Sequence, residues 1–401
     1  MFVTDTRLTQ VHLLPRIAAT FQVVIGLLLL TVGAANAQLF ETKAQQAFMI
    51  DADSGTILIA KNADTSVPPA SLAKLMTMEV VFDAIASGKA SMNDTFKVSE
   101  YAWRTGGAPS RTSTMFAALN SEVRLEDLIQ GVIVQSANDG CIIIAEGMAG
   151  SETAFSERMN SRAQALGMTR SRFVNSTGLP ASGQVVTMRE LVTLANHLWR
   201  DYPQFYKYYS QPEFTWNKIT QRNRNPLLAM GIGADGLGTG FTEESGYAFV
   251  GSAARNDRRL FVALGGLTSD KERAEEARRI VEWGMTAFER APLFAADTVV
   301  GRAKVFGGDK PSVELKAKGA VSIFLPQENR GKVVAHVVYN GPLTAPIVKG
   351  TPVGSLKVWV DQQLTQETPL FAAEDIGKGT LSQRARSAAE ELAFGWLRDF
   401  L

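Results

Sequence analysis

The chain has 401 residues, of which 45% are apolar and 20% are charged, and its formal net charge is +1. This length accommodates two or three domains with a substantial core. A near-neutral chain lacks the excess of Lys and Arg that binding to nucleic acid requires, so we expect no nucleic-acid partner.

Cysteine and histidine are too scarce to suggest disulfide or metal chemistry. Cys141 is the only cysteine, and its apolar neighbours predict a buried side chain. His12, His197 and His336 lie far apart in the sequence and lack metal-ligand spacing. We therefore expect no metal site and no cofactor.

Residues 1–37 have the layout of an export signal. A basic start precedes an apolar stretch at 23–32, and Ala35-Asn36-Ala37 forms a cleavage site of the A-x-A type. We expect cleavage before Gln38 and a protein that works outside the cytoplasm, in the periplasm. An uncleaved membrane anchor stays open, because residues 17–35 are almost long enough to span a bilayer.

The next segment predicts a hairpin followed by a helix. Apolar runs at 48–50 and 57–59 flank a turn at Asp53-Ser54-Gly55, as in a β-hairpin. Pro68-Pro69 then precedes an apolar run of helix formers, which predicts a helix from Ser71 to about residue 88.

Ser71 and Lys74 stand in an S-x-x-K tetrapeptide at the start of that helix. Three residues apart on a helix, their side chains share one face and can meet. A serine hydroxyl becomes a good nucleophile only if a neighbour takes its proton, and a lysine can do so once burial or nearby cations lower its pKa. The tetrapeptide alone is weak evidence, because such spacings occur often by chance.

Further along the chain, a short polar segment separates two apolar runs that predict helices. Residues 123–134 predict a helix that ends at Ser136-Ala137-Asn138, before another apolar run begins at Cys141. A Ser and an Asn two residues apart in such a turn can present a hydroxyl and an amide to one cavity. Asx and Ser turns are common, so this pattern gains weight only from the S-x-x-K before it.

Three more helices and a pair of strands complete the predicted α/β region. Two helices are expected within 151–200, and Gly238-Thr239-Gly240-Phe241 leads into apolar runs at 247–253 and 260–265 that predict neighbouring antiparallel strands. Residues 273–288 predict a helix that buries one apolar face.

The chain changes character after Pro292. Short alternating segments separated by Gly, Pro and Asn predict a small all-β domain at 291–378. Residues 379–401 predict a helix in which Leu392, Trp396 and Phe400 recur at four-residue spacing. Such a helix suits peripheral contact with the inner membrane, and a helix packed on its own protein is the open alternative.

Taken together and in this order, the motifs resemble the active-site set of penicillin-recognising serine enzymes, which is S-x-x-K, S-x-N and K-T-G. The whole layout is similar to that of low-molecular-mass D-alanyl-D-alanine carboxypeptidases. The resemblance implies a catalytic domain at 38–290, with an antiparallel sheet flanked by helices, that acts on peptidoglycan pentapeptides and is acylated by β-lactams.

The resemblance also implies a role for each motif residue. Ser71 would attack the D-Ala-D-Ala carbonyl, Lys74 would accept its proton, and Ser136 would relay a proton to the leaving D-Ala. Asn138 would hold Lys74 or the substrate amide. Thr239, Gly240 and Phe241 would line the substrate-binding strand, where the backbone N–H groups of Ser71 and Phe241 would form the oxyanion hole.

Gly238 is a departure from the family's third motif, because it stands where the family has lysine. That lysine faces the terminal carboxylate of the substrate, and truncating one member of such a charge pair typically costs about 2–5 kcal/mol. Thr239 can still bond the carboxylate, and an arginine from elsewhere (Arg222, Arg224 or Arg255) is a candidate for the missing charge.

Three other functions stay open at this stage. Gly238 motivates a pseudoenzyme that binds peptidoglycan ends or scaffolds wall enzymes without turnover. A β-lactamase would need a well-placed deacylating carboxylate, and Glu157 is more simply a solvated helix residue. An endopeptidase would use the same machinery on a cross-linked substrate.

Overall fold

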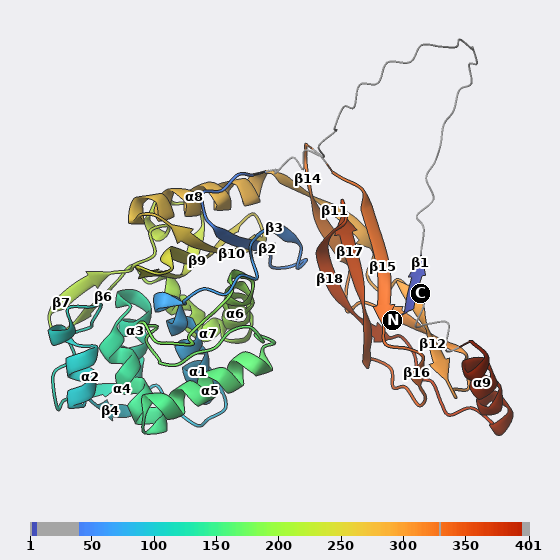
Figure 1. Cartoon of the computed structure of the whole chain (residues 1–401), viewed down its shortest axis with the longest axis horizontal. Coiled ribbons are helices and arrows are strands. Elements are labelled where there is room, and N and C mark those ends of the chain that lie inside the picture. Colours follow the sequence, from blue (N-terminus) through green and yellow to red (C-terminus); the bar gives the residue numbers. More distant parts are fainter. Residues whose placement is uncertain (1, 6–39, 329, 395–401) are drawn as a thin grey trace, which may run out of the picture. The chain divides into compact units, whose positions relative to one another are not determined.

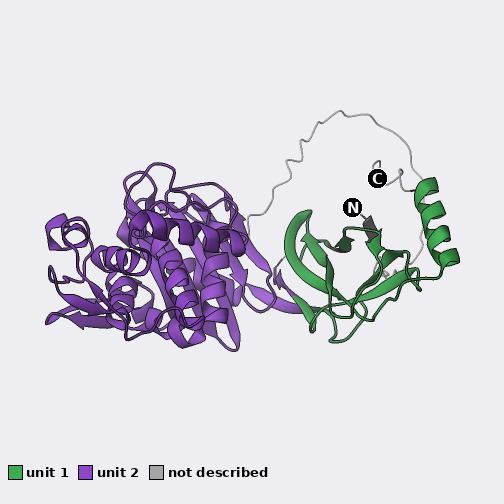
Figure 2. Ribbon diagram, turned by 90° about the horizontal axis from the view of Figure 1, so that it is seen from below, with its two compact units in different colours: residues 1–41, 292–322, 329–401 green, residues 42–291, 323–328 purple. Residues whose placement is uncertain are grey.

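The computed structural model describes residues 2–5, 40–328 and 330–394. Within them the chain forms two compact units, coloured separately in Figure 2. The larger unit comprises residues 42–291 and 323–328, and the described residues of the smaller one are 2–5, 40–41, 292–322 and 330–394. The return of residues 323–328 to the larger unit was not predicted from the sequence.

The larger unit is built on a five-stranded antiparallel sheet (Figure 1). Its strands are, in spatial order, β3 (Ile57–Lys61), β2 (Gln46–Asp51), β10 (Arg258–Leu267), β9 (Gly246–Arg255) and β8 (Ala234–Thr242). The predicted hairpin is confirmed as β2 and β3, and the predicted neighbouring strands are confirmed as β9 and β10. Strand β8 forms one edge of the sheet.

The helices of the larger unit are α1 (Lys74–Ala86), α2 (Glu100–Thr105), α3 (Leu125–Gln135), α4 (Asn138–Ala149), α5 (Glu152–Ala165), α6 (Met188–Asp201), α7 (Pro203–Tyr206) and α8 (Asp270–Thr286). Helices α6 and α8 pack directly on the sheet. Adjacent residues of a strand point to opposite faces. Phe261 of β10 contacts Trp199 of α6, whereas its neighbour Leu260 packs against Gly284 of α8. Helices α6 and α8 therefore lie on opposite sides, which is the α/β architecture expected from the sequence.

Short elements fill the connections of the larger unit. They are the 3₁₀ turns η1 (Ala70–Ala73), η2 (Ala108–Ser110), η3 (Lys207–Ser210) and η4 (Leu228–Met230), with the strand pairs β4 (Thr95–Lys97) and β5 (Glu122–Arg124), and β6 (Glu213–Trp216) and β7 (Ile219–Arg222). A further strand pair, β11 (Phe288–Phe294) and β14 (Val321–Pro326), includes residues of both units. Cys141 is fully buried on α4, as predicted.

The smaller unit is the predicted β domain with a C-terminal helix. Its seven-stranded sheet has the order β1 (Phe2–Asp5), β15 (Val333–Tyr339), β17 (Pro352–Val360), β18 (Gln363–Ala372), β13 (Ser312–Lys316), β12 (Gly301–Phe306) and β16 (Leu343–Thr344). The helix is α9 (Leu381–Phe394). Alternating burial along β12 and β13 explains why period-two patterning predicted this domain.

The predicted export signal and the predicted C-terminal helix are each described only in part. Residues 2–5 of the expected export signal form β1, which pairs antiparallel with β15, and the rest of the signal lies outside the described residues. Trp396 and Phe400 of the expected amphipathic helix lie outside them as well. No helix among the described residues is both long and apolar enough to cross a membrane.

Candidate active site

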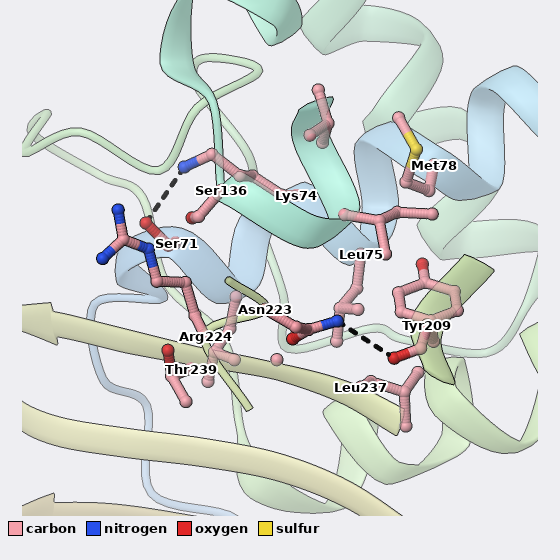
Figure 3. Close-up of a pocket in the computed structure, with 14 residues that line it drawn as sticks. Ser71, Lys74, Leu75, Met78, Ser136, Tyr209, Asn223, Arg224, Leu237 and Thr239 are labelled. Atoms are coloured by element: carbon pink, nitrogen blue, oxygen red, sulfur yellow. Dashed lines mark hydrogen bonds between the residues drawn. The ribbon is translucent and has the colours of Figure 1, made fainter. Parts of the chain in front are cut away.

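Ser71 and Lys74 meet at the junction of η1 and α1. Sequence analysis predicted a helix from Ser71, but the α-helix begins at Lys74 and a 3₁₀ turn precedes it. In a 3₁₀ turn, side chains three residues apart eclipse each other. The Lys74 Nζ accordingly donates a hydrogen bond of 2.9 Å to the Ser71 Oγ (Figure 3).

Lys74 is buried, and its second partner comes from a distant loop. Its Nζ donates a 2.6 Å hydrogen bond to the backbone oxygen of Thr177, between α5 and α6. Burial lowers the pKa of Lys74 from its ordinary value of 10.5 to about 8. The amine is therefore partly neutral near physiological pH, as a proton acceptor for Ser71 must be.

Backbone strain occurs at two points of this site. Ala70, directly before Ser71, has φ of 49°, and Ser136 at the end of α3 has φ of 56°. Both values lie in the left-handed region that L residues rarely adopt. Such outliers cluster at functional sites, where the surrounding structure holds them in place.

Ser136 lines the same pocket as Ser71 and Lys74, whereas Asn138 does not. The Asn138 Nδ2 donates a 3.0 Å hydrogen bond to the Thr112 Oγ1, and its backbone N–H bonds the Ser113 oxygen. Its Oδ1 is buried and has no hydrogen-bond partner among the described residues. Asn138 thus ties the 112–113 segment to the start of α4 and keeps one acceptor free.

Strand β8 supplies the opposite wall of the pocket through Gly238 and Thr239. Gly240 lies against η1, since a Cβ built on it would stand 3.1 Å from the Ala70 Cβ. Phe241 is 49% exposed, and its ring centroid lies 4.3 Å from that of Tyr247 on β9. The close approach at Gly240 brings the backbone of β8 beside that of Ser71.

Arg224 is the arginine that lines this pocket, among the three raised from the sequence. Arg222 is an exposed residue of β7, and Arg255 donates to the Ile232 oxygen at 3.4 Å. Figure 3 shows the Arg224 side chain pointing toward Ser71, with Thr239 nearby. Arg224 forms no hydrogen bond or ion pair with the residues that the structure describes, so its charge is available to a ligand.

Two asparagines position Arg224. The Asn223 Nδ2 donates to the backbone oxygens of Tyr209 and Gln211, at 3.2 and 2.9 Å. The buried Asn225 Nδ2 donates 2.8 Å to the Gly236 oxygen on β8. The Asn-Arg-Asn sequence is visible in the chain, but nothing in it reveals that β8 is its partner.

Asp139 is a buried carboxylate that sequence analysis did not select. Its side chain accepts hydrogen bonds from the Thr114 Oγ1 at 2.6 Å and from three backbone N–H groups at 3.0 Å, those of Met115, Ala117 and Gly140. It follows Asn138 directly, so the two residues together fix the 112–117 segment beside the S-x-N turn. Neither composition nor spacing signalled this role.

Comparisons with known proteins agree with one another. Residues 32–267 match the family described as D-alanyl-D-alanine carboxypeptidase (Peptidase S11), and residues 288–378 match the C-terminal domain of penicillin-binding protein 5. The D-alanyl-D-alanine carboxypeptidase DacC of Escherichia coli (strain K12) is 36% identical over 334 residues, which cover 82% of this chain and 84% of the relative.

Solved structures show the same similarity. Penicillin-binding protein 5 from Haemophilus influenzae is 35% identical, has a TM-score of 0.71, and is matched over 84% of this chain and 98% of its own. Penicillin-binding protein D2 from Listeria monocytogenes, in its ampicillin-bound form, is 28% identical with a TM-score of 0.54, and is matched over 62% of this chain and 99% of its own.

Proposed function

The chain belongs to the D-alanyl-D-alanine carboxypeptidase family, peptidase S11, and we propose that Ser71, Lys74 and Ser136 perform its reaction. The enzyme is a serine-type hydrolase that removes the terminal D-alanine of peptidoglycan stem peptides. The observation that carries the assignment of residues is the 2.9 Å contact between the Lys74 Nζ and the Ser71 Oγ, with the lysine buried.

Acylation follows from that contact. The Ser71 Oγ attacks the carbonyl carbon of the terminal peptide bond, and neutral Lys74 takes the hydroxyl proton. Ser136 relays that proton from Lys74 to the nitrogen of the leaving D-alanine as the C–N bond breaks, so Lys74 is neutral again. The backbone N–H groups of Ser71 and Phe241 stabilise the oxyanion, and the product is an ester on Ser71.

Deacylation needs water and the same base. Water attacks the ester carbonyl and gives a proton to Lys74, and the Ser71 oxygen leaves and takes that proton back. The shortened peptide is released and the site is restored. A β-lactam undergoes the same attack by Ser71 with opening of its ring, so we expect β-lactams to acylate the enzyme.

Arg224 and Thr239 recognise the substrate carboxylate in this proposal. Both line the pocket on the side of β8, where the motif lysine is replaced by Gly238. A guanidinium binds a carboxylate through two parallel hydrogen bonds and stays charged at all working pH values. A positively charged residue therefore remains in the site, which favours an enzyme over the pseudoenzyme considered from the sequence.

Release of D-alanine tests this function. Purified protein is incubated with a pentapeptide ending in D-Ala-D-Ala, and free D-alanine is measured beside the Ser71→Ala variant. We expect release by the wild type alone, with a fluorescent penicillin labelling the wild type and not the variant. Equal release by the two proteins would contradict the role of Ser71, and a cross-linked peptide dimer in the same assay would reveal endopeptidase activity.

The place of work is part of the same proposal. We expect export through residues 1–37 and peripheral attachment to the outer face of the cytoplasmic membrane through α9. Leu381 and Leu392 are 82% and 85% exposed and lie three helical turns apart, so they share one face. Co-sedimentation with anionic vesicles tests this attachment, and equal binding by Leu392→Glu would contradict it.

A further inference from the structure

Gly238 leaves a space beside Ser71, and the packing around position 238 does not require a glycine there. A Cβ built on it would meet no atom within 4 Å, and its φ lies outside the left-handed region, so an L side chain is compatible with the backbone. Gly240, two residues on, is different, because a Cβ there would be 3.1 Å from the Ala70 Cβ. Glycine at 240 is explained by close approach, whereas glycine at 238 simply opens the pocket.

The pocket behind Gly238 is mostly apolar. The space that a water-sized group can enter is about 30 Å³, and the figure rises to about 380 Å³ when the open mouth of the pocket is included. Beyond the polar residues at its mouth, its walls come from α1, α3, β8 and η3, through Leu75, Met78, Val132, Ile133, Leu237 and Tyr209. Tyr209 is 2% exposed, and within the described ranges its hydroxyl has no hydrogen-bond partner. The Tyr209 hydroxyl is the exception among these walls, which otherwise present apolar side chains and favour an uncharged, largely apolar occupant.

The polar residues at the mouth identify the part of the substrate that faces this space. In the proposed mechanism, Ser136 protonates the leaving nitrogen, while Thr239 and Arg224 hold the terminal carboxylate. These three residues line the same pocket as Gly238 (Figure 3). The atom between that nitrogen and that carboxylate is the α-carbon of the leaving residue, so its side chain is the group closest to the opening.

We propose that the space at Gly238 is a subsite for the side chain of the leaving D-residue, and that the enzyme releases apolar D-amino acids larger than D-alanine. The inference rests on the proposed function and adds the substrate class. A flexible, unbranched side chain fits a narrow apolar pocket best, and a thioether makes favourable contacts with an aromatic ring such as that of Tyr209. D-methionine is therefore the probe of choice.

The first experiment compares two peptides that differ only at the last residue. One ends in D-Ala-D-Ala and the other in D-Ala-D-Met, and kcat/KM is measured for each with the full wild-type chain. We expect the D-methionine peptide to be cleaved with kcat/KM within tenfold of the D-alanine peptide. A value lower by more than tenfold overturns the subsite. Release from the D-alanine peptide alone contradicts only the subsite, whereas release from neither contradicts the proposed function as well.

The second experiment fills the space. Gly238→Met places an unbranched apolar side chain in the pocket, and Gly238→Ala is the matched control, since its methyl group meets no neighbour. We expect the ratio of D-methionine to D-alanine release to fall at least tenfold in Gly238→Met and less than threefold in Gly238→Ala. An unchanged ratio in Gly238→Met overturns the proposal. Labelling by fluorescent penicillin shows that each variant retains a folded site.

Discussion

The helical wall and the β8 wall of the active site differ in how tightly their polar groups are held. On the helical wall, Lys74 makes two hydrogen bonds and Asp139 accepts four, and both side chains are buried. On the β8 wall, Gly238 leaves open space, and Arg224 is exposed and forms no hydrogen bond or ion pair in the described part of the chain.

In the proposed mechanism the two walls have different roles, and these roles account for the difference. Proton transfer from Ser71 requires donor and acceptor at hydrogen-bond distance, so a shift of 1 Å is costly. Carboxylate recognition is electrostatic and falls off slowly with distance, so a cation from another element can serve. We infer that the β8 wall tolerates a replaced lysine because Arg224 supplies the charge from a neighbouring loop.

Lys74→Met tests the helical wall and should have the largest effect. Loss of the general base should lower D-alanine release by about 10²–10⁴-fold. Lys74→Arg is the informative companion, because arginine keeps the charge and cannot accept the proton at working pH. Activity of Lys74→Met within tenfold of the wild type would mean that another group takes the proton.

Asp139→Ala tests whether the helical wall depends on its buried anchor. Removal of the carboxylate leaves the Thr114 hydroxyl and the N–H groups of Met115 and Ala117 without their acceptor, which should cost about 2–4 kcal/mol of stability. Urea unfolding measures the loss. Glu157→Ala, at an exposed carboxylate, is the control and should change the midpoint little. Equal midpoints for the two variants would show that the Asp139 carboxylate does not stabilise the fold.

Arg224→Gln tests the β8 wall. Loss of an exposed charge that pairs with the substrate should lower kcat/KM by about 10–100-fold, less than at a buried pair. Arg224→Lys should recover part of the loss, since it restores charge without the planar fork. If Arg224→Gln retained full kcat/KM, the β8 wall would have to obtain its cation elsewhere.

The pH dependence of acylation reports on Lys74 directly. Its pKa is lowered to about 8, and the neutral amine is the reactive form, so the rate of penicillin labelling should rise with pH and level off above about 8. Between pH 6 and 7 the rise should be about tenfold. A rate that is flat across this range would show that acylation does not wait for neutral Lys74.

Gly238→Lys restores the family motif and should have the smallest effect. The side chain enters open space, so the fold should tolerate it, and the added charge should raise penicillin acylation a few-fold above the level that Arg224 already supports. In an Arg224→Gln background the gain should be larger, because the lysine then supplies the missing charge. Equal gains in the two backgrounds would show that the two positions do not substitute for each other.

Local patterns were enough for much of the fold and for the contact between Ser71 and Lys74. Two prolines before a run of helix formers located the Ser71–Lys74 turn, and short apolar runs beside turn residues identified β2, β3, β9 and β10. The helix predicted at 273–288 is α8, and Ala277 and Ile280 lie on its buried face. These features depend on spacings within single elements, which the sequence displays directly.

Contacts between segments that are distant in the sequence became apparent only in the tertiary structure. The sequence offered three arginines for one missing charge, and only the bond from Asn225 to Gly236 shows why Arg224 lies beside β8. The Thr177 oxygen that accepts from Lys74 and the Thr112 hydroxyl that accepts from Asn138 likewise lie in loops. Nothing in the sequence of these loops indicates which residue each would contact. Spacing within an element fixes which side chains share a face, whereas contacts between elements depend on how sheet and helices pack, and no local pattern encodes that.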